Sequence, residues 1–134
     1  LAWYLYQHRL FWTPQEEELL AAHLTPTYLD SKPLAGQRYI KKPIFGREGA
    51  GIAIVEPDGA TSYEAEECDD CDLIYQQFVP SADVQQETDN GEATGKYTYS
   101  CFVINGKASE TFVRLQPGEI TGMEAYFVPV LDEK

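Results

Sequence analysis

A short apolar run that ends in two lysines and a proline, and then enters a glycine-rich loop, constrains the fold more than any other part of this chain. The run is YIKKP at residues 39–43, and glycines follow at positions 46, 49 and 51. Ile-Ala-Ile-Val at 52–55 reads as a second strand. Because glycine accepts backbone conformations that other residues avoid, we expect a flexible loop to join the two strands as a hairpin.

The glycine loop has the composition of an anion-binding loop. Closely spaced glycines allow backbone amides to approach and surround an anion, and Lys41 or Lys42 places a positive charge beside them. The loop matches neither GxxxxGK[ST] nor GxGxxG, and a strand rather than a helix follows it. These residues predict a hairpin lid over phosphate groups, and the alternative is an ordinary hairpin with a generous turn.

Composition narrows the classes of partner. The chain has 134 residues, enough for a modest core, and we expect a single domain over residues 1–134. The formal net charge of -12 argues against nucleic acid, because binding to a phosphate backbone requires clustered Lys and Arg. An acidic surface is compatible with cationic substrates such as amines. The sequence contains no stretch long and apolar enough to suggest a membrane span.

The three cysteines favour neither a disulfide framework nor a metal centre. Cys68 and Cys71 have CxxC spacing, but no second CxxC or histidine pair completes a four-ligand zinc site, so we expect no metal ligands in this chain. The acidic residues around these thiols disfavour the thiolate form that redox chemistry needs. We therefore expect a solvated acidic loop and a reducing, cytoplasmic location.

Local patterns predict an α+β fold. Residues 1–12 read as the end of a helix, and Thr13-Pro14-Gln15-Glu16 is a strong start for a second helix that ends before Pro26. Residues 80–95 are polar and predict a mobile loop, whereas Asn105-Gly106 predicts a tight hairpin. The candidate strands are 38–42, 51–56, 72–79, 96–104, 108–115 and a short one near 126–130.

Four segments carry a family resemblance. They are KKPIFGREGAGI (41–52), LIYQQFVP (73–80), CFVINGKASETFVR (101–114) and EITGMEAYFVPV (119–130). Together they resemble the C-terminal ATP-grasp region of the glutathionylspermidine synthase family, over nearly the whole chain. The resemblance implies an ATP-grasp-type antiparallel sheet with N-terminal helices and a glycine-rich lid hairpin.

This resemblance also implies a reaction, the ATP-dependent ligation of a carboxylate to an amine. ATP phosphorylates the carboxylate, Mg2+ bridges the phosphates, and the amine attacks the acyl phosphate to give an amide. In the founding activity the acid is glutathione and the amine is the polyamine spermidine. We therefore expect ATP, a small-molecule acid and a small-molecule amine as partners.

Residue roles follow from the same resemblance. Lys42 matches the nucleotide-binding lysine, while Lys41 is expected on the opposite face of its strand. Arg114 matches an arginine that faces the γ-phosphate or the acyl phosphate, which makes it the candidate catalytic residue. The strand at 74–79 would offer exposed backbone groups to the adenine edge. The expected nucleotide-binding residues are Lys42, Gly46, Arg47, Glu48, Gly49, Ala50, Gln76, Gln77 and Phe78.

The start of the chain suggests a part of a larger protein. Leu1 opens directly into apolar, helical residues, and the family's Mg2+ ligands precede the matching segment, so we expect the C-terminal portion of a longer ligase that is inactive alone. Apolar residues such as Trp3 and Phe11 would then form a patch that supports a dimer. Glu110-Thr-Phe-Val precedes Arg114 where relatives have a glycine-rich approach. A non-catalytic binding domain that keeps the ATP-grasp fold is therefore the alternative.

Overall fold

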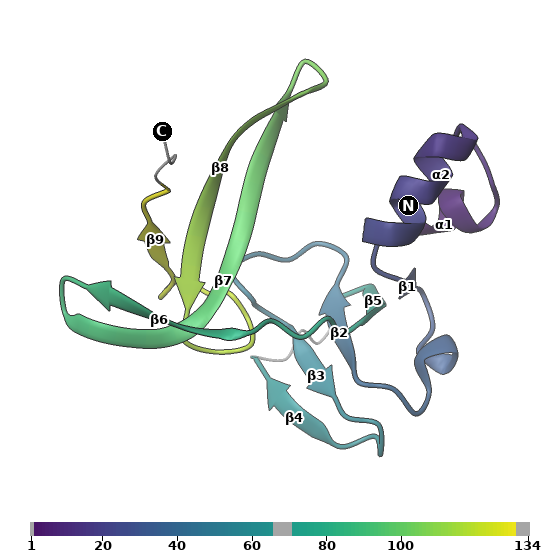
Figure 1. Ribbon diagram of the computed structural model, residues 1–134. Helices are drawn as coiled ribbons and strands as arrows, with labels where there is room; N and C mark the ends of the chain where they lie inside the picture. The colour runs from purple at the N-terminus through teal and green to yellow at the C-terminus, as the bar shows by residue number, and fades with distance from the viewer. Residues whose placement is uncertain (1, 66–70, 131–134) are drawn as a thin grey trace. The chain divides into compact units, whose positions relative to one another are not determined.

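The computed structural model describes residues 2–65 and 71–130. The chain divides into two compact units, Leu1–Val79 and Pro80–Lys134. Each unit contains one antiparallel sheet, and the two helices belong to the first unit (Figure 1). The prediction of antiparallel strands with few helices is confirmed, although the strands form two sheets where the sequence predicts one. The expected single domain over the whole chain stays a prediction.

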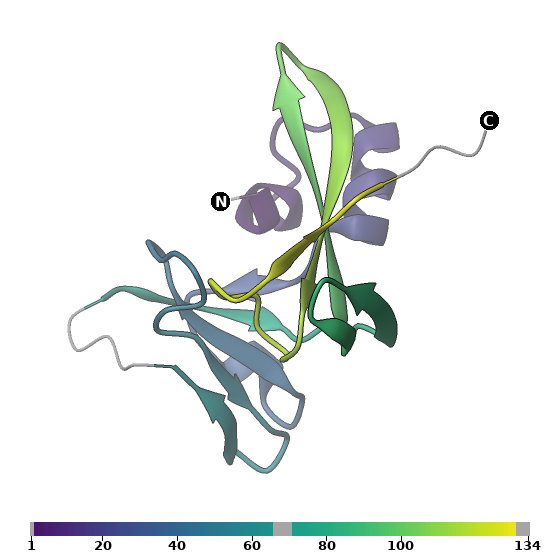
Figure 2. The same ribbon diagram turned by 90° about the vertical axis from the view of Figure 1, so that its left-hand side faces the viewer.

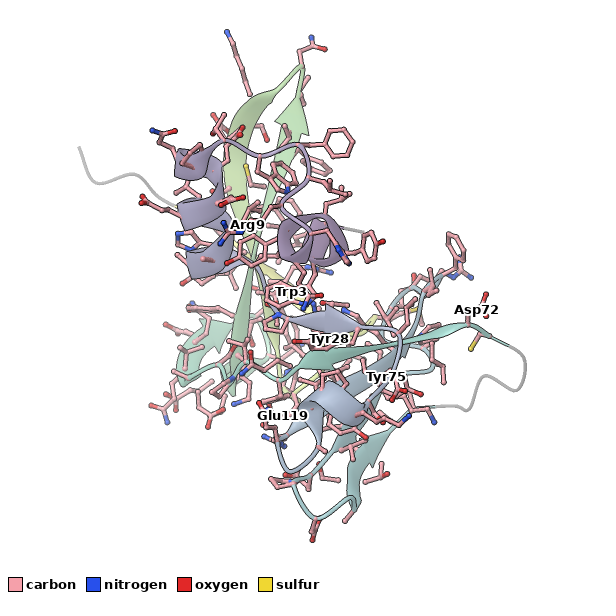
Figure 3. All side chains as sticks on the ribbon, turned by 90° about the vertical axis from the view of Figure 1, so that its right-hand side faces the viewer. Trp3, Arg9, Tyr28, Asp72, Tyr75 and Glu119 are labelled. Atoms are coloured by element: carbon pink, nitrogen blue, oxygen red, sulfur yellow. The ribbon has the colours of Figure 1, made fainter. Side chains whose placement is uncertain are left out.

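The first helix, α1 (Ala2–Gln7), is shorter than predicted. It stops because Arg9 and Phe11 adopt left-handed φ angles of 50° and 73°, which do not continue a right-handed helix. The Trp3 ring lies 6.1 Å from the ring of Tyr28, in an edge-on arrangement (Figure 3). An aromatic contact therefore connects α1 to the first sheet, whereas Phe11 is 85% exposed.

The second helix, α2 (Pro14–His23), begins with the predicted capping box. The Thr13 hydroxyl accepts a hydrogen bond from the Glu16 amide, and the Glu16 carboxylate accepts one from the Thr13 amide at 2.8 Å. The last turn ends when Leu24 takes an extended conformation, two residues before Pro26. Both predicted ends of this helix are confirmed.

The first sheet has the strand order β1-β5-β2-β3-β4. The glycine loop connects β2 to β3, which pair antiparallel with Lys41 opposite Ala53, so the predicted hairpin is confirmed. The sheet packs around four buried side chains, those of Leu34, Ala53, Ile54 and Val55. The elements of this unit after α2 are β1 (Thr27–Tyr28), the short 3-10 helix η1 (Lys32–Leu34), β2 (Tyr39–Pro43), β3 (Ala53–Val55), β4 (Thr61–Glu64) and β5 (Leu73–Gln77).

The second sheet has the order β6-β7-β8-β9. β7 and β8 form a long twisted ribbon (Figure 2), and β9 pairs with only three residues of β8. Asn105 and Gly106 join β7 to β8 with φ angles of 50° and 73°, which confirms the predicted tight hairpin. The bounds are β6 (Asp83–Thr88), β7 (Gly91–Ile104), β8 (Lys107–Gln116) and β9 (Tyr126–Val128).

The prediction of a mobile polar loop over residues 80–95 is wrong. Residues 83–88 form β6, which pairs antiparallel with the first part of β7. Exposed and half-buried residues alternate along β6, but only Val84 among them is apolar. Strand prediction depends on alternation of apolar and polar residues. β6 lacks this alternation, because polar Gln86 and Thr88 occupy the other half-buried positions.

The cysteines differ in their state. Cys101 is free and exposed, whereas Cys71 is disulfide-bonded, so the expectation of reduced thiols is wrong for Cys71. Cys68 and the acidic residues at 66–70 lie outside the described residues, so the expected solvated loop stays a prediction. None of the described helices has the length and apolar character that a membrane crossing requires.

Gly95→Ala should destabilise the second unit. Gly95 is buried on β7, and a Cβ at this position would lie 2.4 Å from the carbonyl oxygen of Gln116 on β8. Because that oxygen belongs to the backbone of β8, the steric clash can be removed only if β7 and β8 shift relative to each other. We therefore expect a loss of about 1–3 kcal/mol in the free energy of unfolding. Urea denaturation measures this loss.

Gly118→Ala is the matched control for this measurement. The nearest atom to a Cβ at Gly118 is the flexible Nε2 of Gln116, at 4.0 Å. The change at this position should stay within about 0.5 kcal/mol. Equal losses in the two variants would contradict the close approach of β7 and β8 at Gly95.

Candidate functional site

A neutral side chain holds the ammonium group of Lys42. Lys42 Nζ donates a hydrogen bond to Gln76 Oε1 at 2.7 Å. Gln76 Nε2 donates in turn to Thr27 Oγ1 at 2.9 Å, and Thr27 Oγ1 donates to the Thr25 carbonyl oxygen at 3.0 Å. Residues of β2, β5 and β1 form this series, so three adjacent strands fix the position of one positive charge.

The register of the sheet places these groups on one face. In the ladder between β2 and β5, Ile40 lies opposite Gln76 and Lys42 lies opposite Ile74. Alternate residues of a strand share a face, so all four side chains are on the same side of the sheet. Lys41 is on the opposite side. The prediction that Lys42, and not Lys41, faces the glycine loop is consistent with this register.

The glycine loop, residues 44–52, is a compact turn. Gly49 and Gly51 have φ angles of 81° and 69°, and Glu48, directly before Gly49, has a φ of 56°. The Ala50 amide donates to the Arg47 carbonyl at 2.9 Å, and the Ile52 amide donates to the Gly49 carbonyl at 3.3 Å. The left-handed residues close the loop into a tight turn, and the amides of Ala50 and Ile52 are used within it.

Lys42 and the glycine loop line the same pocket, which has a volume of about 360 Å³. This volume lies within the usual range for small-molecule sites, roughly 300–1,000 Å³. All five expected loop residues contribute to it, and Ile74 of β5 supplies an apolar wall. The lining residues are Lys42, Pro43, Ile44, Gly46, Arg47, Glu48, Gly49, Ala50, Ile52 and Ile74.

The environment of Lys42 differs from that of the cations that are held in ion pairs. Arg38 pairs with Glu56 at 2.9 Å and Lys96 with Asp83 at 2.8 Å, whereas no ion pair between Lys42 and a described carboxylate is found. Burial lowers the pKa of Lys42 from its ordinary value, because desolvation disfavours the charged form. A half-buried ammonium whose only described partner is neutral retains its charge for an incoming anion.

Gln77 and Phe78 lie apart from the pocket. β5 is paired on both sides, and the amides of Gln77 and Phe78 donate to the carbonyl oxygens of Pro26 and Arg38. The expectation that the backbone of this strand is exposed to an adenine edge is therefore wrong for these two donors. The Phe78 ring also carries the Arg38 guanidinium on one face, with the guanidinium carbon 4.1 Å from the ring centroid.

Arg114, the candidate catalytic residue, belongs to β8 in the second unit. It lies opposite Thr98 on β7 and Phe127 on β9. Its Nε is buried and makes no hydrogen bond with any described residue. An unsatisfied buried donor is costly, so this nitrogen is a ready hydrogen-bond donor for an additional group.

Aromatic residues and hydroxyls surround Arg114 on its face of the sheet. The Phe112 ring stacks on Phe102 with centroids 5.5 Å apart and lies 6.2 Å from Phe127. The Thr98 and Thr121 hydroxyls are 2.8 Å apart. The sequence analysis did not identify these residues, and neither their spacing nor a local motif marks them.

Metal-binding side chains do not gather in the described ranges. Residues 2–65 and 71–130 contain no group of three or more His, Cys, Asp or Glu side chains placed to hold an ion. No role for a metal is therefore assigned to particular residues of this chain.

Comparison with known proteins identifies a family. The family model described as glutathionylspermidine synthase preATP-grasp matches residues 9–131. This range includes Thr27, Lys42, the glycine loop, Gln76 and Arg114. No curated protein matches the chain.

The Lys42 ammonium should lose its proton below pH 10.5, its ordinary pKa, because burial lowers that pKa. Lys96 provides an internal comparison, since its hydrogen bond with Asp83 raises its pKa. An NMR titration of the lysine side chains should therefore give Lys42 the lower midpoint of the two. A higher midpoint for Lys42 than for Lys96 would contradict the described environment.

The same shift predicts a dependence of stability on pH. Between the lowered folded-state pKa of Lys42 and 10.5, the unfolded chain binds more protons than the folded chain. The contribution of Lys42 to the free energy of unfolding therefore rises with pH across this window. Lys42→Met should flatten that rise, as measured by denaturation at a series of pH values.

Proposed function

The chain belongs to the glutathionylspermidine synthase preATP-grasp family, and from that premise we propose that it supplies the nucleotide-binding part of an ATP-dependent carboxylate–amine ligase. In this proposal the hairpin of β2 and β3 is an ATP-grasp lid, and the glycine loop covers the phosphates. The observation that carries the proposal is the Lys42 ammonium, which shares a pocket with the glycine loop and donates to a neutral oxygen of Gln76.

The pocket residues fit a polyphosphate. Lys42 places its charge at one wall, and Arg47 from the loop adds a second cation. Loop amides other than those of Ala50 and Ile52, which donate within the loop, would supply uncharged hydrogen-bond donors to the phosphates. Glu48 is the acidic residue in the pocket lining, and its carboxylate must point away from a bound phosphate to avoid repulsion.

The proposed reaction joins an acid to an amine. The γ-phosphoryl group of ATP passes to a carboxylate oxygen and ADP leaves. The amine nitrogen then attacks the carbonyl carbon, and inorganic phosphate and a proton leave as the amide forms. Fixed cations favour this transfer because negative charge spreads over the phosphoryl oxygens in the transition state. Lys42 and Arg47 would hold the nucleotide phosphates. For Arg114, a role in stabilising the charge of the transferred group is proposed on the family resemblance alone.

The adenine base of ATP would lie near the end of β5. Gln77 and Phe78 follow Gln76 on β5, and we propose that their side chains, not their amides, approach the base. The Phe78 ring would stack on the base through the face opposite the Arg38 guanidinium. Mg2+ supplies charge neutralisation to nucleotide phosphates in such reactions, and no step is assigned to it here.

The family also suggests the substrates. A small acid and a small amine, such as glutathione and a polyamine, are proposed on family membership alone. The net charge of -12 would attract a polycationic amine at low ionic strength.

A binding role without catalysis is the second candidate. Leu10, Phe11 and Leu19 near the two helices are 43%, 85% and 62% exposed, and apolar side chains of this kind favour contact with a partner or with a second copy of the chain. The two candidates differ in what they require of Lys42, since only the ligase needs its charge for nucleotide binding.

Lys42→Ala in the full-length protein should weaken ATP binding roughly 10- to 100-fold, because a charge-assisted hydrogen bond to phosphate is lost. Calorimetry with Mg·ATP measures the affinity, and phosphate release measures ATP turnover. Lys41→Ala removes an equal charge from the opposite face of β2 and should bind ATP as the wild type does. Unchanged affinity in Lys42→Ala would favour the binding role over the ligase.

Arg114→Ala should lower ATP turnover roughly 100- to 1,000-fold, while nucleotide affinity falls much less, because its proposed contact is with the transferred phosphoryl group. Steady-state kinetics in the full-length protein separates kcat from KM. Lys107→Ala removes an exposed cation from the same strand and serves as the control. A loss confined to KM would exclude the catalytic role of Arg114.

A further inference from the structure

We propose that Thr27 is a positioning residue for Lys42, and that it acts through Gln76 to hold the ammonium at the glycine loop. The inference deepens the proposed nucleotide site and rests on it for its functional consequence. No motif at Thr27 suggests such a role, although the residue lies within the range that the family model matches.

The direction of each hydrogen bond supports this assignment. Thr27 has a single hydroxyl proton, and it donates that proton to the Thr25 carbonyl at 3.0 Å. The Thr27 oxygen can therefore only accept from Gln76, so the Gln76 amide must present its NH2 group to Thr27. The other end of that amide, Oε1, then faces Lys42 Nζ at 2.7 Å.

The orientation of the Gln76 amide determines how Lys42 is held. An amide rotated by half a turn would direct its NH2 group at the ammonium, which places two donors against each other. Without the Thr27 hydroxyl, the Gln76 NH2 group has no acceptor at Thr27. Thr27 then no longer favours one orientation of the Gln76 amide over the other. The ammonium would then lose the oxygen that stabilises its charged form.

The geometry of the sheet makes the arrangement rigid. Thr27 lies directly opposite Gln76 in the ladder between β1 and β5, and Gln76 lies opposite Ile40, two residues before Lys42 on β2. The three side chains therefore run across three paired strands on one face. A long lysine side chain has considerable rotational freedom. Because its end is already held near the loop, phosphate binding costs less side-chain conformational entropy.

Among the residues that the structure describes, few charged groups lie near the Lys42 ammonium. Arg47 and Glu48 of the glycine loop line the pocket with Lys42. On the same face of the sheet, Arg38 and Glu56 pair with each other. β5 contributes no charged side chain between Leu73 and Gln77, so a change in the titration of Lys42 after a substitution at Thr27 reports on Gln76.

The test compares Thr27→Val, which keeps the branched shape and removes the hydroxyl, with Thr27→Ser, which keeps the hydroxyl. Two properties are measured in the full-length protein. They are the titration midpoint of Lys42, by NMR without nucleotide, and the affinity for Mg·ATP, by calorimetry. Thr61→Val makes the same substitution on β4, an exposed strand of the same sheet, and is the control. Thr27→Ala is the second variant if Thr27→Val does not fold.

We expect Thr27→Val to lower the midpoint of Lys42 and to weaken ATP binding roughly five- to tenfold, as for the loss of one hydrogen bond. Thr27→Ser should restore both, and Thr61→Val should change neither. An unchanged midpoint in Thr27→Val, or a failure of Thr27→Ser to restore it, would overturn the inference. If the midpoint falls but the wild type binds no ATP, the positioning role is supported and the proposed nucleotide site is excluded.

Discussion

Pairing of β2 on both of its edges is the constraint on which the candidate site depends. Lys41 and Lys42 are adjacent cations, and a slip of one residue in the register would exchange their faces. The ladders to β3 and β5 fix this choice, with Ile40 opposite both Ile54 and Gln76. Ile54 is completely buried, and a slip of β2 would replace Ile40 opposite it with Tyr39 or Lys41. The pairing of Ile40 with Ile54 thus favours the register in which Lys42 is on the side of the glycine loop.

In this acidic chain, Lys42 has no carboxylate partner among the residues that the structure describes. The sequence contains 22 Asp and Glu residues against 10 Lys and Arg, and three described cations, Lys32, Arg38 and Lys96, have acidic partners. Lys42 instead meets a glutamine. An ion pair would neutralise the ammonium and would have to break before a phosphate could bind, whereas a neutral acceptor orients the charge without cancelling it.

Features encoded over a few residues could be predicted from the sequence, and features that depend on distant partners could not. The capping box at Thr13 and the turn at Asn105 are local, so their residues specify them. β6 was missed because its half-buried positions are mostly polar. Thr27 and Gln76 are separated by 49 positions, and no local pattern indicates that they meet. The division of the strands into two sheets is likewise a property of long-range pairing.

The Lys42-Pro43 pair lies where β2 stops pairing with β3 but still pairs with β5. Pro43 has no amide hydrogen, so it cannot donate to a neighbouring strand. The pairing with β3 ends at Lys41 opposite Ala53, while the pairing with β5 continues through Pro43 opposite Leu73. The next amide, that of Ile44, still donates to the Asp72 carbonyl on the β5 side at 2.8 Å. One edge of β2 is therefore released for the glycine loop, while pairing of the other edge with β5 keeps Lys42 in place.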